Sequence, residues 1–183
     1  GGGEGEAAFA EVRERGRVPS RIGPRVELLA AAGNVAARLN VSEGTQVVSR
    51  HWERFIDGTP WSLQTTYYPM DLVIRGARRL LLAEDVRDGS VEYLRQELGL
   101  VQVGYRDRIL VRPPDEQEIR FFRVPDDGRI PVIFLIRTGY ESTDSGPVPF
   151  RVTFTALPAD RNQLVINFGE VPAARAAPAA PSS

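Results

Sequence analysis

Two pairs of β-rich segments, each joined by a short glycine-containing turn, constrain the fold of this chain more than any other feature. The first pair is residues 45–56 and 61–68 around Asp57-Gly58, and the second is residues 131–140 and 147–157 around residues 144–146. Asp-Gly favours tight hairpin turns because both residues tolerate positive φ. Two hairpins predict antiparallel pairing, and no strand–helix–strand rhythm of a parallel sheet is present.

The remaining segments complete the prediction of an α+β fold: a single antiparallel sheet with short helices. Glycine, proline and capping residues divide the chain between the hairpins into short elements. Further strands are expected at residues 19–32 with a break at Pro24, at 100–112 and at 163–168, and helices at 6–16, 34–39, 91–98 and 115–122. Asn34 and Ser90 are the expected N-caps of two of these helices.

Composition excludes several classes of site. The 183 residues predict one domain at 6–171, a linker remnant at 1–5 and an Ala/Pro tail at 172–183. The chain has no cysteine and one histidine, His51, so we expect no metal site and no cofactor. Apolar runs fall far short of the ~20 residues of a membrane span.

The charge balance argues against nucleic-acid binding by this segment itself. All 23 basic residues are arginine, and they stand against 24 acidic residues. A DNA-binding domain normally carries a basic excess. The absence of lysine reflects GC-rich coding, and together with the high alanine content it indicates an actinobacterial source.

An ordered set of short motifs runs through most of the chain. In order they are Phe9-Ala10-Glu11, Arg15-Gly16-Arg17, Ala36-Ala37-Arg38-Leu39, Glu43-Gly44, Asp57-Gly58-Thr59-Pro60, Thr66-Tyr67-Tyr68-Pro69, Gly89-Ser90-Val91-Glu92-Tyr93-Leu94, Arg137-Thr138-Gly139-Tyr140 and Gly146-Pro147-Val148. This pattern, over about residues 6–169, resembles the effector-binding (UTRA) domain of GntR-type bacterial transcription regulators of the HutC-like branch.

The resemblance implies a chorismate-lyase-like fold and a function in transcription regulation. It implies a cytoplasmic, dimeric, non-enzymatic domain that binds a small-molecule metabolite effector. DNA would be bound only through a winged helix-turn-helix domain absent from this chain, and no membrane is involved. The start of the chain, Gly1-Gly2-Gly3 without methionine, fits a fragment of a longer protein.

Arg50, Trp52 and Arg54 are the first candidate ligand-binding residues. They alternate along one strand and therefore share a face of the sheet. Guanidinium groups hold phosphate or carboxylate bidentately, which favours an anionic effector. Trp52 stands where many relatives carry arginine, and it could stack on a sugar or an apolar ligand. For Arg50 the alternative is a solvated face or a pair with a nearby glutamate.

The register of the first hairpin decides which residue faces Arg54. A three-residue turn places Trp52 opposite Gln64 and Arg54 opposite Ser62. A two-residue turn pairs Arg54 with Trp61, and the sequence leaves both registers open. Gln64 is a candidate for binding hydroxyl or amide groups, or else a polar residue on a wet face.

Four further candidates lie later in the chain. Ser90 opens a helix whose N-terminal N–H groups could meet an anion. Tyr93 is either a ligand contact or core packing. Arg137 either pairs in the interior or turns to the cavity, and Arg151 is a candidate cavity residue. His51 points away from Arg50 and Trp52, so we expect it to be structural.

Two alternative functions remain at this point. A chorismate-lyase-like enzyme would need an acid–base group beside arginine-bound carboxylates, and Glu53, Asp107 and Glu141 are the available carboxylates. A degenerate dimerisation module would have its cavity filled by bulky residues such as Trp52, Trp61 and Pro149.

Overall fold

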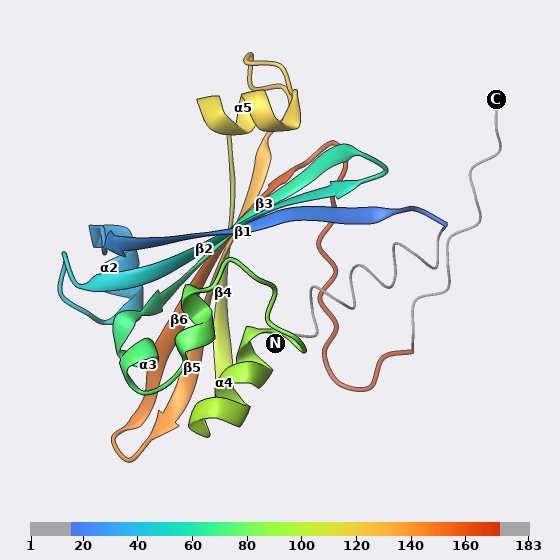
Figure 1. The fold of residues 1–183 in the computed structure, drawn as a ribbon. Coiled ribbons are helices and arrows are strands. Elements are labelled where there is room, and N and C mark those ends of the chain that lie inside the picture. The colour runs from blue at the N-terminus through green and yellow to red at the C-terminus, as the bar shows by residue number, and fades with distance from the viewer. Residues whose placement is uncertain (1–15, 173–183) are drawn as a thin grey trace.

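The computed structural model describes residues 16–172 as six antiparallel strands in one sheet, ordered β1-β2-β3-β6-β5-β4 (Figure 1). The strands are β1 Pro19–Ala30, β2 Gln46–Ile56, β3 Thr59–Pro69, β4 Gln102–Arg112, β5 Val132–Thr143 and β6 Gly146–Pro158. Both expected hairpins are present, and so is the break in β1, where the register shifts between Ile22 and Arg25. The predicted α+β fold on a single antiparallel sheet is confirmed.

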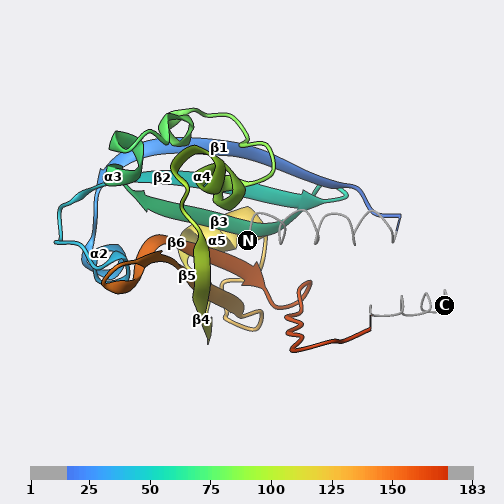
Figure 2. The same ribbon diagram turned by 90° about the horizontal axis from the view of Figure 1, so that it is seen from below.

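Short helical segments cover parts of both sheet faces. They are α2 Gly33–Leu39, α3 Met70–Ile74, the 3-10 turn η1 Arg78–Leu81, α4 Ser90–Leu98 and α5 Glu116–Phe122. Figure 2 shows α3 and α4 against the part of the sheet formed by β1, β2 and β3. The sequence missed α3 and η1 because segments of five and four residues are too short to show helical periodicity. No helix within residues 16–172 is long and apolar enough to cross a membrane.

Strand alternation sends neighbouring residues of β2 into different cores. Val48 belongs to the apolar cluster with Tyr68, Leu72 and Phe150 beneath α3 and α4. Val47, one residue earlier, packs on the opposite face in the cluster of α2. A third cluster, around Phe122 of α5, packs on that same opposite face. Because both faces of the sheet are buried at this end, the register of β2 is fixed by apolar packing.

Residues 163–168 are not a strand, contrary to the expectation. β6 ends at Pro158, and Arg161 donates to the carbonyls of Pro60 and Phe122 (2.9 and 3.1 Å). Residues 163–168 then run exposed, without a ladder partner. The physical reason is that β3 and β5 already occupy both sides of β6, so the segment that follows β6 cannot pair with it and could pair only at the distant edges, β1 or β4.

Other expectations concern helix ends. The N-cap of α2 is Ala32, and the Asn34 side chain bonds the adjacent N–H of Val35 instead. The helix ends after Leu39, as the expected range 34–39 has it, and its C-cap Asn40 adopts the left-handed conformation that asparagine tolerates. Residues 6–15 of the expected helix at 6–16, the linker remnant at 1–5 and residues 173–183 of the expected tail at 172–183 lie outside the described residues.

A buried glutamate anchors α5 to the sheet. The carboxylate of Glu118 accepts from the N–H of Asp115, whose own side chain accepts from the Glu118 N–H, completing a capping box. The Glu118 side chain also takes two bonds from Arg112 of β4, at 2.7 and 3.1 Å. Glu118 is buried, whereas the side chain of Arg112 is 32% exposed.

We predict that Glu118→Ala lowers the free energy of unfolding by about 2 kcal/mol, because the partly buried Arg112 guanidinium and the Asp115 N–H lose the carboxylate that accepts from them. Glu116→Ala is the matched control, since Glu116 lies in the same helical turn with a side chain 91% exposed. Its exposed pair with Arg120 is worth less than about 0.5 kcal/mol. Urea unfolding followed by circular dichroism measures both; equal losses would contradict the anchoring role of Glu118.

Candidate functional site

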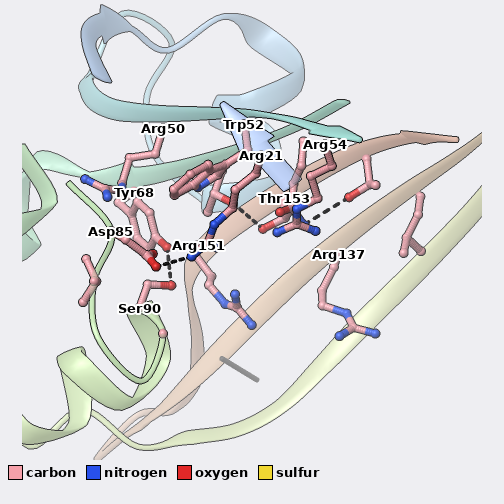
Figure 3. Close-up of a pocket in the computed structure, with 16 residues that line it drawn as sticks. Arg21, Arg50, Trp52, Arg54, Tyr68, Asp85, Ser90, Arg137, Arg151 and Thr153 are labelled. Carbon is pink, nitrogen blue, oxygen red and sulfur yellow. Dashed lines mark hydrogen bonds and ion pairs between the residues drawn. The ribbon is translucent and has the colours of Figure 1, made fainter. Parts of the chain in front are cut away.

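A cavity of about 210 Å³ opens on the sheet face beneath the 82–90 loop and the start of α4 (Figure 3). Its wall is formed by five neighbouring strands of the sheet, β1, β2, β3, β6 and β5, and by the loop that leads into α4. Of the eight residues predicted from sequence, seven line it: Arg50, Trp52, Arg54, Gln64, Ser90, Arg137 and Arg151. The cavity is open, so Trp52 forms part of its wall and does not fill it.

A bulge in the first hairpin decides the register that the sequence left open. The turn has two residues, since Ile56 pairs with Thr59, yet Arg54 pairs with Ser62 and Trp52 with Gln64. The register shifts between Arg54 and Phe55, which absorbs one extra residue on β3. The two-residue turn and the pairing expected from a three-residue turn therefore coexist.

Arg50 holds the cavity loop in place. Its guanidinium donates to the carbonyls of Leu80, Leu82 and Glu84, at 2.8, 2.7 and 2.6 Å. The residue is 4% exposed, and this burial lowers its pKa from the usual value. Arg50 therefore lines the cavity, but its guanidinium N–H groups are bonded to backbone carbonyls. The sequence analysis predicted either ligand binding or a solvated or glutamate-paired side chain, and neither describes this role.

Arg21 and Arg54 face each other across β1 and β2. Arg21 forms an ion pair with Asp85 of the loop, and its guanidinium lies 4.5 Å from the ring centre of Trp52. Burial, reinforced by the charge of Arg21, lowers the pKa of Arg54 to about 10, while Asp85 acts in the opposite direction. Arg54 remains cationic at neutral pH.

Arg137 and Arg151 form a second arginine pair on β5 and β6. Arg137 makes a bidentate pair with Asp107, at 2.8 and 2.7 Å, and lies 4.0 Å from the ring centre of Tyr105. Arg151 is buried and donates to the side-chain oxygen of Gln102. Burial first, and then the mutual repulsion with Arg151, lowers the pKa of Arg137.

Gly139 makes room for this second pair. A Cβ at that position would lie 2.7 Å from the Gln102 side-chain oxygen and 3.0 Å from Nε of Arg151. Any other residue would therefore push apart the contact that orients Arg151.

The floor between the two arginine pairs is neutral and polar. The hydroxyls of Thr66 and Thr153 are 2.9 Å apart, and the amide of Gln64 donates to the Thr155 hydroxyl at 3.4 Å. These threonines were missed, although they follow from the same alternation and register that place Arg54 and Gln64 on this face.

Two expectations about α4 need correction. Tyr93 does not line the cavity; it is 6% exposed in the core, and its hydroxyl accepts from the N–H of Arg79 at 3.1 Å. Ser90 is the first helical residue, and the N-cap is Gly89. The Ser90 hydroxyl accepts a 2.6 Å bond from the hydroxyl of Tyr68 on the cavity wall. Tyr93 points inward because a tyrosine at this helical position packs against Leu80 and Leu94 in the same cluster.

His51 lies on the opposite face, as expected from alternation. Its Nδ1 is 2.7 Å from the Thr65 hydroxyl, and burial, helped by Arg25, lowers its pKa. It contributes nothing to the cavity wall.

The carboxylates considered for catalysis are poorly placed. Asp107 is bound to Arg137, and Glu141 pairs with Arg75 at 3.3 Å. Glu53 does not line the cavity. Among residues 16–172, Asp85 is the one carboxylate on the wall, and it is paired with Arg21.

The model of the UTRA domain family matches residues 14–162. The chain belongs to the UTRA domain family. The resemblance to the UTRA domain that was stated from the sequence is confirmed. No curated protein matches the sequence significantly.

Solved structures share the fold of this UTRA domain. The effector domain of PhnF from Mycobacterium smegmatis is 21% identical, with a TM-score of 0.67 over 89% of this chain and 94% of that chain. A GntR-family regulator from Bacillus cereus is 18% identical, with a TM-score of 0.69 over 82% and 99%. The C-terminal domain of the histidine utilization repressor from Pseudomonas syringae is 15% identical, with a TM-score of 0.65 over 83% and 99%.

We predict that Arg50→Ala lowers the free energy of unfolding by about 2 kcal/mol, because charge-assisted bonds to three loop carbonyls are lost. Amide hydrogen exchange should accelerate in residues 78–90 before it does so in the sheet. Arg25→Ala is the control, since Arg25 is exposed and paired only at the surface with Glu27. Unchanged exchange in the loop would show that Arg50 does not hold it.

Proposed function

We propose that the cavity is the effector site of this UTRA domain and that it takes a small anionic metabolite. The observation that supports this most strongly is the cavity wall itself, on which the described part of the chain places five arginines and one carboxylate, Asp85. Partly buried guanidinium groups bind carboxylate or phosphate more strongly than exposed ones, since water competes less. Threonine and glutamine side chains supply neutral hydrogen-bond partners for the rest of the ligand.

Binding of the metabolite would alter DNA binding by a separate winged helix-turn-helix domain in the cytoplasm. Two solved neighbours are described as the effector domain of PhnF and the ligand-binding domain of a GntR-family regulator from Bordetella bronchiseptica, which supports this role. The near-neutral charge of the chain argues against DNA contact by this domain itself. An enzyme is disfavoured, because Asp85 is held by Arg21 and is exposed to water.

We predict that an anionic metabolite raises the melting temperature of the domain. A ligand at ~100 times its Kd adds about 2.7 kcal/mol to the free energy of unfolding. Arg54→Gln should abolish the rise. Arg108→Gln, which removes an exposed arginine opposite Ile136 on the other sheet face, should leave it intact. Thermal unfolding against sugar phosphates, amino acids, imidazoles and aromatic acids makes the measurement; a rise that survives both Arg54→Gln and Arg137→Gln refutes this cavity as the site.

We also propose that the domain forms a homodimer through the free edge of β4. Edge strand β1 is protected by prolines and a bulge. Strand β4 has a bulge between Gln102 and Gly104, but from Gly104 to Val111 it is exposed and lacks proline. On the cavity side of β4, Tyr105 and Ile109 flank Asp107 symmetrically, and Val111 follows as a further exposed apolar residue. Antiparallel pairing of two β4 strands about Asp107 sets Tyr105 opposite Ile109.

Sedimentation velocity should therefore show a dimer that dissociates in Ile109→Lys, because a charge replaces an apolar partner in the new strand pair. Ile74→Lys is the matched control, since Ile74 is 78% exposed on α3 and lies outside the β4 edge. A dimer that survives Ile109→Lys and Val111→Lys would move the interface elsewhere, and a monomer at high micromolar concentration would exclude the dimer.

A further inference from the structure

The cavity arginines form two separate groups rather than one cluster. Arg21 and Arg54 lie on β1 and β2, and Arg137 and Arg151 lie on β5 and β6. Strand β3 runs between them, so β2 and β6 are two strand spacings apart, about 10 Å. Figure 3 shows Arg21 and Arg54 on one side of the cavity and Arg137 and Arg151 on the other.

Stacking and ion pairs keep the two groups apart. Arg21 lies over the ring of Trp52, and Arg137 lies over the ring of Tyr105. The first guanidinium is tied to Asp85 and the second to Asp107. Arg21 therefore reaches from β1 over β2 to the loop, whereas Arg137 is held toward β4, so the two groups have separate anchors.

Within each group the two guanidinium charges repel one another. Arg21 and Arg54 are direct cross-strand partners, an arrangement of like charges that destabilises a sheet. Arg137 and Arg151 lie diagonally across β5 and β6, and the charge of Arg151 lowers the pKa of Arg137. An anion bound between the two arginines of a group would relieve this repulsion.

The surface between the groups suits an uncharged, hydroxyl-bearing spacer. The paired hydroxyls of Thr66 and Thr153 and the Gln64 amide can donate and accept hydrogen bonds. An anion bound at one end would leave the repulsion at the other end unrelieved.

We propose that the effector carries two anionic groups, one bound at Arg21 and Arg54 and the other at Arg137 and Arg151, joined by a short polar spacer. This inference rests on the proposed function of the cavity. It narrows the effector to doubly anionic metabolites, such as sugar bisphosphates, phosphorylated sugar acids or hydroxylated diacids.

Inorganic phosphate is the first probe, because it tests each group without knowledge of the effector. Arginine Nε–Hε signals are followed by NMR while phosphate is added. Signals of both groups should shift in the wild type. In Arg54→Gln only the Arg137–Arg151 group should still respond, and in Arg137→Gln only the Arg21–Arg54 group. Arg137→Gln is used because Arg151 is the more buried of its pair and its loss endangers folding.

The outcomes separate the two proposals. Shifts confined to one group overturn the doubly anionic effector and leave the anionic site standing. No shift in either group overturns both. Arg108→Gln, on the other sheet face, should behave as the wild type and reports any general effect of lost charge.

A length series tests whether one ligand bridges the groups. Dicarboxylates from malonate to suberate are compared with monocarboxylates of equal length by thermal unfolding. In the wild type the apparent affinity should peak at one spacer length, by roughly tenfold over the matched monoacid, because the second contact is intramolecular. Arg54→Gln and Arg137→Gln should each remove the peak. A flat series in the wild type overturns the bridging ligand.

Discussion

The hydrogen bonds from Arg50 to the carbonyls of the 78–85 segment are the contact on which the cavity depends. This segment has no strand partner, and its apolar side chains, such as Leu80, hold only one side of it. The guanidinium fills the other side by reaching three carbonyls at once. It thereby places Asp85 opposite Arg21 and leads the chain into α4 at Ser90. Without this arginine the sheet would keep its core, but the cavity would lose its roof.

The cavity exists because one face of β2 and β3 changes character along its length. Val48 and Tyr68 are core residues beneath α3 and α4. Two and four residues further along, the same face carries Arg50 and Trp52 on β2 and Thr66 on β3. The short helices cover only the apolar end, so the polar end stays open. The core and the cavity are therefore neighbouring stretches of the same face of β2 and β3, the first lined by apolar residues and the second by polar ones.

This alternation explains how much the sequence could predict. Strand period and hairpin turns were enough to place Arg54 and Gln64 on one wall. They could not reveal the role of Arg50, whose carbonyl partners come some thirty residues later in a segment without periodicity. Asp85 was missed for the same reason. The strand wrongly predicted at 163–168 shows a second limit. The β propensity of a segment does not show whether a strand beside it is free to pair, and here both sides of β6 are occupied, by β3 and β5.

Electrostatics links the cavity to the rest of the domain. Burial of Arg54 beside Arg21 makes the ligand-free pocket less stable, as its lowered pKa reflects. Under the proposed function, an anion bound there would relieve the repulsion and compete with Asp85 for Arg21. Because Asp85 lies in the loop that continues into α4, this exchange of partners would act on the position of that loop. The same arginines would then bind the anion and pass the effect of its binding to α4.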